Sequence, residues 1–266
     1  MIRLFSQSLA VQAEAVRIES KVRKRPRPTK NMVGMTVQVT GSATREKGIS
    51  RFVRYAFFKA LPELRRLSSS ESELAKQEFL SRLRSYQEQM ALRTYSTMGT
   101  RGDVDFAVWT IADSLLKLQA FHSDIIKTGI GRFLTITHSF LAMTRPSEYF
   151  GRETDSEPSG SKYLFVYPLS KKREWYSIPV EERRRMMKDH VAVGSKYPSV
   201  TIHTSYSFGL DDHEFVLSFE TDIPEDFLKL VMELRGSEAS RYTAVETPIF
   251  TCISAEPQEI LDLMCP

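Results

Sequence analysis

The stretch Tyr95-Ser96-Thr97-Met98-Gly99, followed by Asp105-Phe106-Ala107-Val108, has a second copy later in the chain: Tyr206-Ser207-Phe208-Gly209, followed by Glu214-Phe215-Val216-Leu217. The two copies are 110 positions apart at their glycines. Other matching pairs keep nearly this separation, from 113 positions between Phe52 and Phe165 to 109 between Arg132 and Arg241. A nearly constant separation is what a duplication followed by small loop deletions leaves behind. We therefore expect two copies of one structural unit.

Each copy has the pattern strand, helix, strand, strand, helix, strand. Period-two runs of β-branched and aromatic residues predict strands near 50–58, 92–97, 104–110 and 131–143, and again near 162–170, 200–207, 213–220 and 247–253. Period-3.6 segments with end signals predict helices near 70–91, 112–128, 179–193 and 224–236. A βαββαβ unit packs its helices on one face of an antiparallel sheet. The expected fold class is α+β, a duplicated ferredoxin-like (βαββαβ)2 protein whose two sheets face each other or curl into a barrel.

The charge distribution sets the outer boundaries. Residues 1–30 carry eight Lys or Arg and two Glu, whereas the rest of the chain has a slight acidic excess within a total of +4. We expect a basic N-terminal extension (1–45), a first half (46–150), a polar linker (151–161), a second half (162–254) and a C-terminal tail (255–266). No aromatic residue is interleaved with the charges, so a solvated leader is favoured over a nucleic-acid-binding arm. An organelle transit peptide stays open as an alternative, with Glu14 and Glu19 against it.

Several protein classes are excluded by what the sequence lacks. The longest apolar run, 136–143, is interrupted by polar residues and is too short for a membrane span. Cys252 and Cys265 form no CxxC pair, which argues against a disulfide framework and a structural zinc site and favours a reducing compartment, by default the cytoplasm. The signatures GxGxxG, GxxxxGK[ST], HExxH and GxSxG are absent.

His190 stands out among the five histidines. On the predicted helix it lies near the middle of an apolar stripe about 140° wide that also contains Val180, Met186, Met187 and Val193. A buried imidazole needs a partner for its ring nitrogens. Residue type alone favours a satisfied core histidine, but a haem iron beside two methionines would also explain the stripe.

Two other positions could meet a ligand. His203 alternates with Thr201 and Ser205 on the polar face of a strand, which is either wet or lines a ligand cavity. Tyr167 and Lys171 share a strand face if the strand stays regular through Pro168, and a phenol with an ammonium could hold a carboxylate. The residues alone favour a buried tyrosine and a solvated lysine.

Four motifs together carry a family resemblance: Tyr167-Pro168-Leu169-Ser170-Lys171, Met186-Met187-x-x-His190, residues 206–212, and Glu238-Ala239-Ser240-Arg241-Tyr242. With a looser match through Thr144-Arg145-Pro146-Ser147-Glu148-Tyr149, the chain resembles the chlorite dismutase superfamily over about residues 48–253, and within it the coproheme decarboxylases. The resemblance implies a dimeric α+β barrel, a haem or iron-coproporphyrin III ligand and a homo-oligomer, usually a pentamer.

The resemblance also implies residue roles. His190 would be the proximal iron ligand, with Glu238 accepting the hydrogen bond from its ring N–H. Tyr167 would be the redox tyrosine that takes a hydrogen atom from a propionate. Contacts to the porphyrin and its propionates would come from the following residues: Arg145, Tyr167, Pro168, Leu169, Ser170, Lys171, His203 and Ser240.

The position thirteen after His190 separates the subfamilies. Chlorite dismutases have an arginine there and Firmicutes-type decarboxylases a glutamine, whereas this chain has His203. A neutral imidazole can take a proton from peroxide, so the predicted role of His203 is a catalytic base above the iron. Actinobacterial decarboxylases place a distal histidine before the tyrosine, where this chain has Glu153 or a neighbour.

The expected function is therefore peroxide-dependent decarboxylation of coproheme to haem b, at two propionates in turn. One alternative is a haem-binding or haem-transfer protein with weak peroxidase activity. Chlorite dismutase is a second alternative, disfavoured by the missing arginine. The expected partners are coproheme, hydrogen peroxide and further copies of the chain, with no nucleic acid and no membrane span.

Overall fold

The computed structural model describes residues 50–149 and 157–265, which all lie in one compact unit, Glu46–Pro266. The first half contains β1 (Phe52–Ala60), α1 (Ser69–Gln87), β2 (Ala91–Ser96), β3 (Phe106–Ala112), α2 (Leu115–Ile126) and β4 (Leu134–Met143). The second half repeats this order as β5 (Tyr163–Lys171), α4 (Val180–Gly194), β6 (Thr201–Tyr206), β7 (Phe215–Thr221), α5 (Pro224–Arg235) and β9 (Phe250–Ser254). The predicted duplication of a βαββαβ unit is confirmed.

Short elements join these twelve. They are η1 (Pro62–Arg66), η2 (Gly131–Phe133), α3 (Arg173–Ser177), η3 (Glu238–Tyr242), β8 (Thr243–Val245) and α6 (Pro257–Met264). The segment 255–266, predicted as a C-terminal tail, contains the helix α6. Pro257 occupies its first turn and Glu256 and Glu259 form a capping box. Eight residues are too few for a 3.6-residue period to be distinguished from a coincidence.

Eight antiparallel strands close into a barrel. The hydrogen-bonded order is β7-β6-β4-β1-β3-β2-β9-β5, and an additional pairing of β5 with β7 completes the ring; β8 is an appendage on β5. The fourth strand of each half pairs with the second strand of the other half. One of these seams has the single pair Met143 and Tyr206, and the other has two pairs, Tyr95 with Ser254 and Ser96 with Ile253. The two halves therefore share one continuous sheet.

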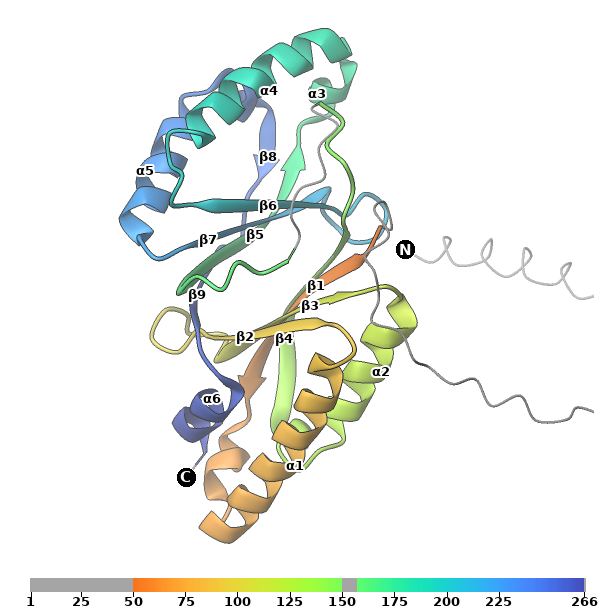
Figure 1. The fold of residues 1–266 in the computed structure, drawn as a ribbon, viewed down its shortest axis with the longest axis vertical. Helices are drawn as coiled ribbons and strands as arrows, with labels where there is room; N and C mark the ends of the chain where they lie inside the picture. Colours follow the sequence, from red (N-terminus) through yellow and green to blue (C-terminus); the bar gives the residue numbers. More distant parts are fainter. Residues whose placement is uncertain (1–49, 150–156, 266) are drawn as a thin grey trace, which may run out of the picture. The chain divides into compact units, whose positions relative to one another are not determined.

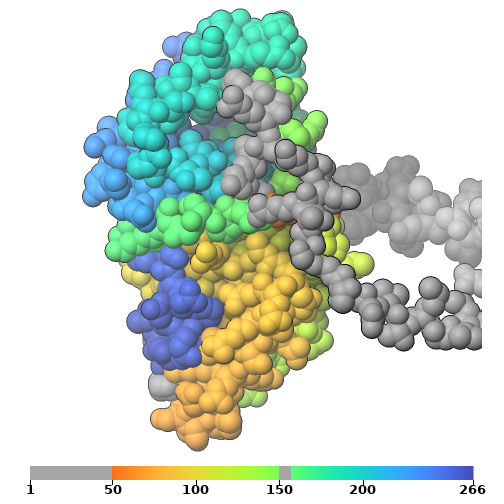
Figure 2. All heavy atoms as spheres, viewed as in Figure 1, coloured from red at the N-terminus to blue at the C-terminus, as the bar shows by residue number. Residues whose placement is uncertain are grey.

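The interior of the barrel is built by both halves. Tyr55 and Trp109 from the first half pack there with Leu164, Val166 and Phe250 from the second. The helices lie outside: Figure 1 shows α1 and α2 on the strands of the first half, and α4 and α5 on those of the second. Figure 2 shows α4 and α5 at one end of the visible face, and α1 and α6 at the other.

The outer face of the first half is tightly covered. α1 begins at a capping box between Ser68 and Glu71 and buries seven side chains, Phe79, Leu80 and Leu83 among them. α6 adds Ile260, Leu261 and Met264 to the same core. Among the described residues, no helix is both long and apolar enough to cross a membrane.

Candidate functional site

The outer sheet face of the second half consists of three cross-strand rows. Residues that lie opposite each other on antiparallel strands point to the same side of the sheet. The rows are Tyr167, Leu217 and Thr204; Phe165, Phe219 and Ile202; and Leu169, Phe215 and Tyr206. Tyr167 is buried in this face and its ring stacks on Phe219 at 5.7 Å. The face is apolar, with the Tyr167 phenol at its centre.

α4 does not cover this face as α1 covers its counterpart. Of its 15 residues only Met186 is buried, and Met186 packs with Trp175 and Ala239 instead of with the sheet. On the sheet side, Ile202 is 39% exposed although it points toward the helices. On α4, Val180 and Val191 are 38% and 44% exposed, while Val193 packs against the cluster that contains Phe165 and Tyr167. A flat apolar ligand on this part of the molecule would bury more of the exposed apolar surface.

His190 lies on α4 with one ring nitrogen engaged. Its Nδ1 is 3.4 Å from Ser237 Oγ, and Ser237 Oγ donates a hydrogen bond to Leu234 O at 2.7 Å. Because the hydroxyl proton is used, Ser237 can only accept from Nδ1–H. Burial, helped by the nearby charge of Lys171, lowers the pKa of His190 to about 4. The ring is therefore neutral at pH 7, with its Nε2 lone pair open to a metal.

Glu238 does not occupy the place predicted for it. Its carboxylate pairs with Arg185 at 2.8 Å, and the partner of His190 is the preceding residue, Ser237. Which of two adjacent residues reaches the ring depends on how η3 turns. That turn is a tertiary feature, and we find no sequence signal for Ser237.

Lys171 lies close enough to His190 for its charge to act on the imidazole. Its Nζ donates to Ala239 O at 2.9 Å and to Thr243 Oγ1 at 3.2 Å, and it lies 5.0 Å from the centre of the Trp175 ring. Burial lowers the pKa of Lys171 to about 8, with Glu214 opposing the shift. Near neutral pH the ammonium is still charged, and it has no carboxylate partner among the described residues within ion-pair distance. It can therefore receive an anionic group of a ligand.

Burial also acts on Tyr167. It raises the pKa of the phenol to about 12, with the charge of Arg235 opposing the shift. Tyr167 therefore keeps its hydroxyl proton at neutral pH. Arg235, at the end of α5, forms an ion pair with Glu246. The sequence analysis did not single out Arg235, because only the fold brings the end of α5 to β5.

The remaining predicted contact residues are dispersed. Ser240 Oγ donates to Arg235 O and Ser237 O, both at 2.8 Å. Arg145 lies 5.8 Å from the Tyr206 ring, at the rim of the outer face. Leu169 belongs to that face, whereas Pro168 lies opposite Val216 and points into the barrel. Ser170 pairs with Val245 of β8.

His203 points away from this site. It lies opposite Ser218 on the inner face of the sheet, is 2% exposed, and contacts the Trp109 ring edge-on at 5.2 Å. Its Nε2 is 2.9 Å from Glu220 Oε2, and Glu220 also accepts a hydrogen bond from Ser159 N at 2.7 Å. This position does not fit the predicted base above the iron, because Tyr167 is on the other side of the sheet. Glu153 lies outside the described residues.

The kind of metal site is limited by the available ligands. Within residues 50–149 and 157–265, no group of three or more His, Cys, Asp or Glu side chains could hold a metal ion. One histidine on a helix beside an apolar sheet face suits a metal that brings its own equatorial ligands, as the iron of a porphyrin does.

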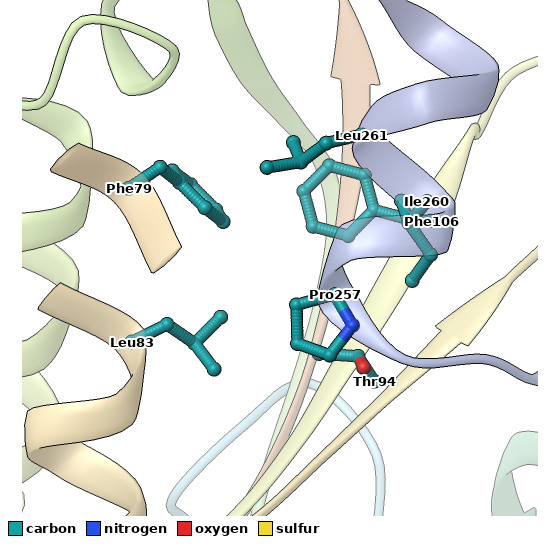
Figure 3. A pocket seen from close by; sticks show the side chains of 7 residues that line it. All are labelled: Phe79, Leu83, Thr94, Phe106, Pro257, Ile260 and Leu261. Atoms are coloured by element: carbon teal, nitrogen blue, oxygen red, sulfur yellow. The ribbon is translucent and has the colours of Figure 1, made fainter. Parts of the chain in front are cut away.

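The first half contrasts with this arrangement. A cavity of only about 10 Å³ lies under α1 and α6, lined by Phe79, Leu83, Thr94, Phe106, Pro257, Ile260 and Leu261 (Figure 3). Thr94 stands 110 positions before Thr204 and therefore marks the equivalent place in the duplicated unit. This space holds at most about one water molecule, so the first half offers no room for a porphyrin here.

Comparison with known proteins places these features in a family. The sequence model of the chlorite dismutase family matches residues 72–255. A coproheme decarboxylase from Mycolicibacterium smegmatis is 37% identical over 161 residues, which are 59% of this chain and 70% of that protein. A coproheme decarboxylase from Staphylococcus saprophyticus is 27% identical over 165 residues, 55% of this chain and 66% of that protein.

Solved structures share the fold. A mutant chlorite dismutase from Candidatus Nitrospira defluvii has a TM-score of 0.75 at 23% identity, covering 80% of this chain and 94% of that one. A heme-binding protein from Thermus thermophilus has a TM-score of 0.73 at 24% identity, covering 81% and 94%. The two-half barrel is common to all of them.

Proposed function

The chain belongs to the chlorite dismutase family, and from this premise we propose that it is a coproheme decarboxylase that converts iron-coproporphyrin III to haem b with hydrogen peroxide. The observation that carries the proposal is the presence of two buried groups in the second half, an imidazole on α4 and a phenol on the outer face of the sheet. His190 presents a neutral imidazole on α4, and Tyr167 presents a protonated phenol on the facing sheet. The 37% identity to a coproheme decarboxylase supports the same substrate.

We assign a separate role to each residue of the candidate site. His190 Nε2 would ligate the iron, and the apolar rows of the sheet would contact the porphyrin. Lys171 holds a propionate through its ammonium, with Arg145 and Arg235 as further cations at the rim. We assign Leu169 and Ser170 to the same edge of the site. The hydroxyl of Ser240 must turn from its backbone acceptors to donate to a carboxylate.

The iron supplies the oxidising chemistry when the porphyrin and peroxide are bound. The chain's part is the hydrogen transfer. Tyr167 gives up its phenolic hydrogen atom and then takes one from the β-carbon of a propionate that Lys171 holds in place. For each propionate, one peroxide and one proton are consumed, and one vinyl group, one carbon dioxide and two waters are formed.

Mass spectrometry tests the proposal directly. The protein is loaded with coproheme without oxygen and titrated with peroxide. We expect two successive mass losses, each of one carbon dioxide and two hydrogen atoms. Bleaching of the porphyrin without these losses would contradict the proposal and favour the alternative, a haem-binding or haem-transfer protein with weak peroxidase activity.

Chlorite chemistry is the weaker alternative. Position 203 carries a histidine that is paired with Glu220 inside the barrel. No arginine is present at this position to act on chlorite. A chlorite assay of the haem-loaded protein, with oxygen evolution as the readout, should give no activity.

Assembly and compartment complete the proposal. We assign a homo-oligomeric state, a pentamer by family resemblance. Leu228 and Met232, one turn apart on α5 and 61% and 67% exposed, provide apolar surface for such contacts. Light scattering of the purified protein measures the state. Cys252 and Cys265 are both free thiols, which suits a reducing compartment such as the cytoplasm.

A further inference from the structure

We propose that Ser237, and not a carboxylate, is the residue that orients the axial imidazole of His190. The inference rests on the proposed function, since it concerns the histidine that would bind the iron. Ser237 is a positioning residue: it touches His190 and not the substrate.

The hydrogen-bond chain fixes one tautomer. Ser237 Oγ is 2.7 Å from Leu234 O, a carbonyl that can only accept, so the hydroxyl proton points there. The lone pairs of Ser237 Oγ then face His190 Nδ1 at 3.4 Å and accept its proton. With Nδ1 protonated in a neutral ring, Nε2 carries the lone pair. Leu234 also anchors the serine backbone, since Ser237 N donates to Leu234 O at 3.0 Å.

The carboxylate of Glu238, the residue after Ser237, is held by Arg185 and not by His190. Glu238 shares Arg185 with Glu182, at 2.8 and 2.6 Å, and Asp189 lies 3.7 Å from the same guanidinium. To reach His190, Glu238 would have to leave this cluster on the outer side of α4. The ion pairs thus keep the negative charge away from the ring.

The chemistry of the partner sets the strength of the axial ligand. A carboxylate acceptor draws the Nδ1 proton toward itself and makes Nε2 a stronger electron donor. A neutral hydroxyl is a weaker acceptor than a carboxylate, even when it donates to a carbonyl, and the ring stays a neutral imidazole. Iron bound here should therefore have a weaker bond to histidine and a higher reduction potential than iron whose histidine faces a carboxylate.

Haem b is the probe for the test, and turnover is not needed. The readouts are the iron–histidine stretching frequency of the ferrous protein by resonance Raman, the midpoint potential and the haem Kd. Ser237→Ala should lower the frequency and weaken haem binding by about tenfold. Ser237→Asp should raise the frequency and lower the potential. Glu238→Gln should leave the frequency unchanged.

Ser195→Ala is the matched control. Ser195 Oγ donates to Val191 O at 3.0 Å at the end of α4, so it forms the same kind of helix-end hydrogen bond without a contact to a histidine. It should leave the frequency and the potential at their wild-type values. A purely structural effect of losing a helix-end hydroxyl would instead appear in both serine variants.

Two results would overturn the inference. One is a frequency that shifts in Glu238→Gln and not in Ser237→Ala, which would make Glu238 the partner. The other is a wild-type protein without an iron–histidine band, which would also remove His190 from the proposed site. A normal band in a protein that releases no carbon dioxide would contradict decarboxylation alone and leave the role of Ser237 standing.

Discussion

The phenol of Tyr167 is buried, which raises its pKa to about 12, so Tyr167 keeps its hydroxyl proton at neutral pH. Tyr167→Phe removes the transferable hydrogen atom and leaves the ring that stacks on Phe219. We expect this variant to bind coproheme and to react with peroxide, but to release no carbon dioxide. Stopped-flow absorption measures the first reaction and mass spectrometry the second. Tyr163→Phe, at the start of the same strand, should decarboxylate normally. Decarboxylation at the wild-type rate in Tyr167→Phe would remove the tyrosine from the reaction.

Because the pKa of Lys171 is lowered, we expect substrate binding to depend on pH. Its pKa of about 8 lies below the ordinary lysine value, so the ammonium is charged below pH 8 and loses its charge as the pH rises through it. The KM for coproheme should therefore rise above pH 8, by about 10- to 100-fold for loss of one charged hydrogen bond. Steady-state kinetics from pH 6 to 10 measures this profile.

Lys171→Met should show the high KM at every pH and no inflection near 8. Lys172→Met, the exposed neighbour, is the control and should keep the wild-type profile. An unchanged inflection in Lys171→Met would mean that another group binds the propionate.

We expect that replacing His203 lowers the free energy of unfolding, because His203 pairs with the buried Glu220. His203→Ala leaves the fully buried carboxylate of Glu220 without its imidazole. Removing one partner of a buried pair costs about 3–5 kcal/mol of unfolding free energy. His138→Ala is the control, because its partner Asp103 is 43% exposed, and it should cost about 1 kcal/mol or less. Urea denaturation measures both. Equal stability of the two variants would contradict the burial argument.

For individual residues, the period-two pattern predicted which side chains share a face of a strand, but not whether that face points into the barrel or toward the helices. It grouped Thr201, His203 and Ser205 correctly, and because the face is polar it predicted a face that is either wet or lines a ligand cavity. The closed barrel is polar inside at this point, since Glu220, Ser218 and Tyr55 lie there. That this polar face of β6 is an interior face follows only from the strand pairing between the two halves, which closes the barrel.

Among the elements, α1 and α4 are the equivalent helices of the two copies of the βαββαβ unit, and they differ in how much of their surface is buried. α1 fills the space over its sheet with seven buried side chains, whereas α4 buries one. The apolar stripe of α4 around His190 is predictable from the sequence. How few side chains of α4 are buried is not, because the packing of a helix depends on side chains from several elements at once.

A pair of equivalent substitutions tests this difference. Thr204→Trp adds bulk to the outer sheet face of the second half and should lose most of its haem affinity. Thr94→Trp adds the same bulk beside a cavity of about 10 Å³ and also removes the hydrogen bond from Thr94 Oγ1 to Ala255 O. Overpacking of this kind costs about 1–3 kcal/mol. Thermal unfolding and haem titration separate the two effects. A folded Thr204→Trp with wild-type haem affinity would place the porphyrin elsewhere.

For the whole molecule, the shared sheet predicts cooperative unfolding. Leu261 on α6 is buried against the first half, and Leu261→Ala should cost about 2–5 kcal/mol. Because strands of the two halves are hydrogen-bonded at both seams, the second half should lose stability together with the first. Far-UV circular dichroism and the fluorescence of Trp175, measured in a Trp109→Phe background, should give one midpoint. Two separate midpoints would show that the halves unfold independently.

The reciprocal seams have a consequence for how the barrel depends on protein concentration. Each half leaves two strand edges that the other half completes, so two separate halves would face a bimolecular association and would come apart on dilution. Because one chain carries both halves, closure of the barrel is intramolecular. Ring closure is thereby independent of how much protein is present. The first half thereby acts as a permanent built-in partner for the second half.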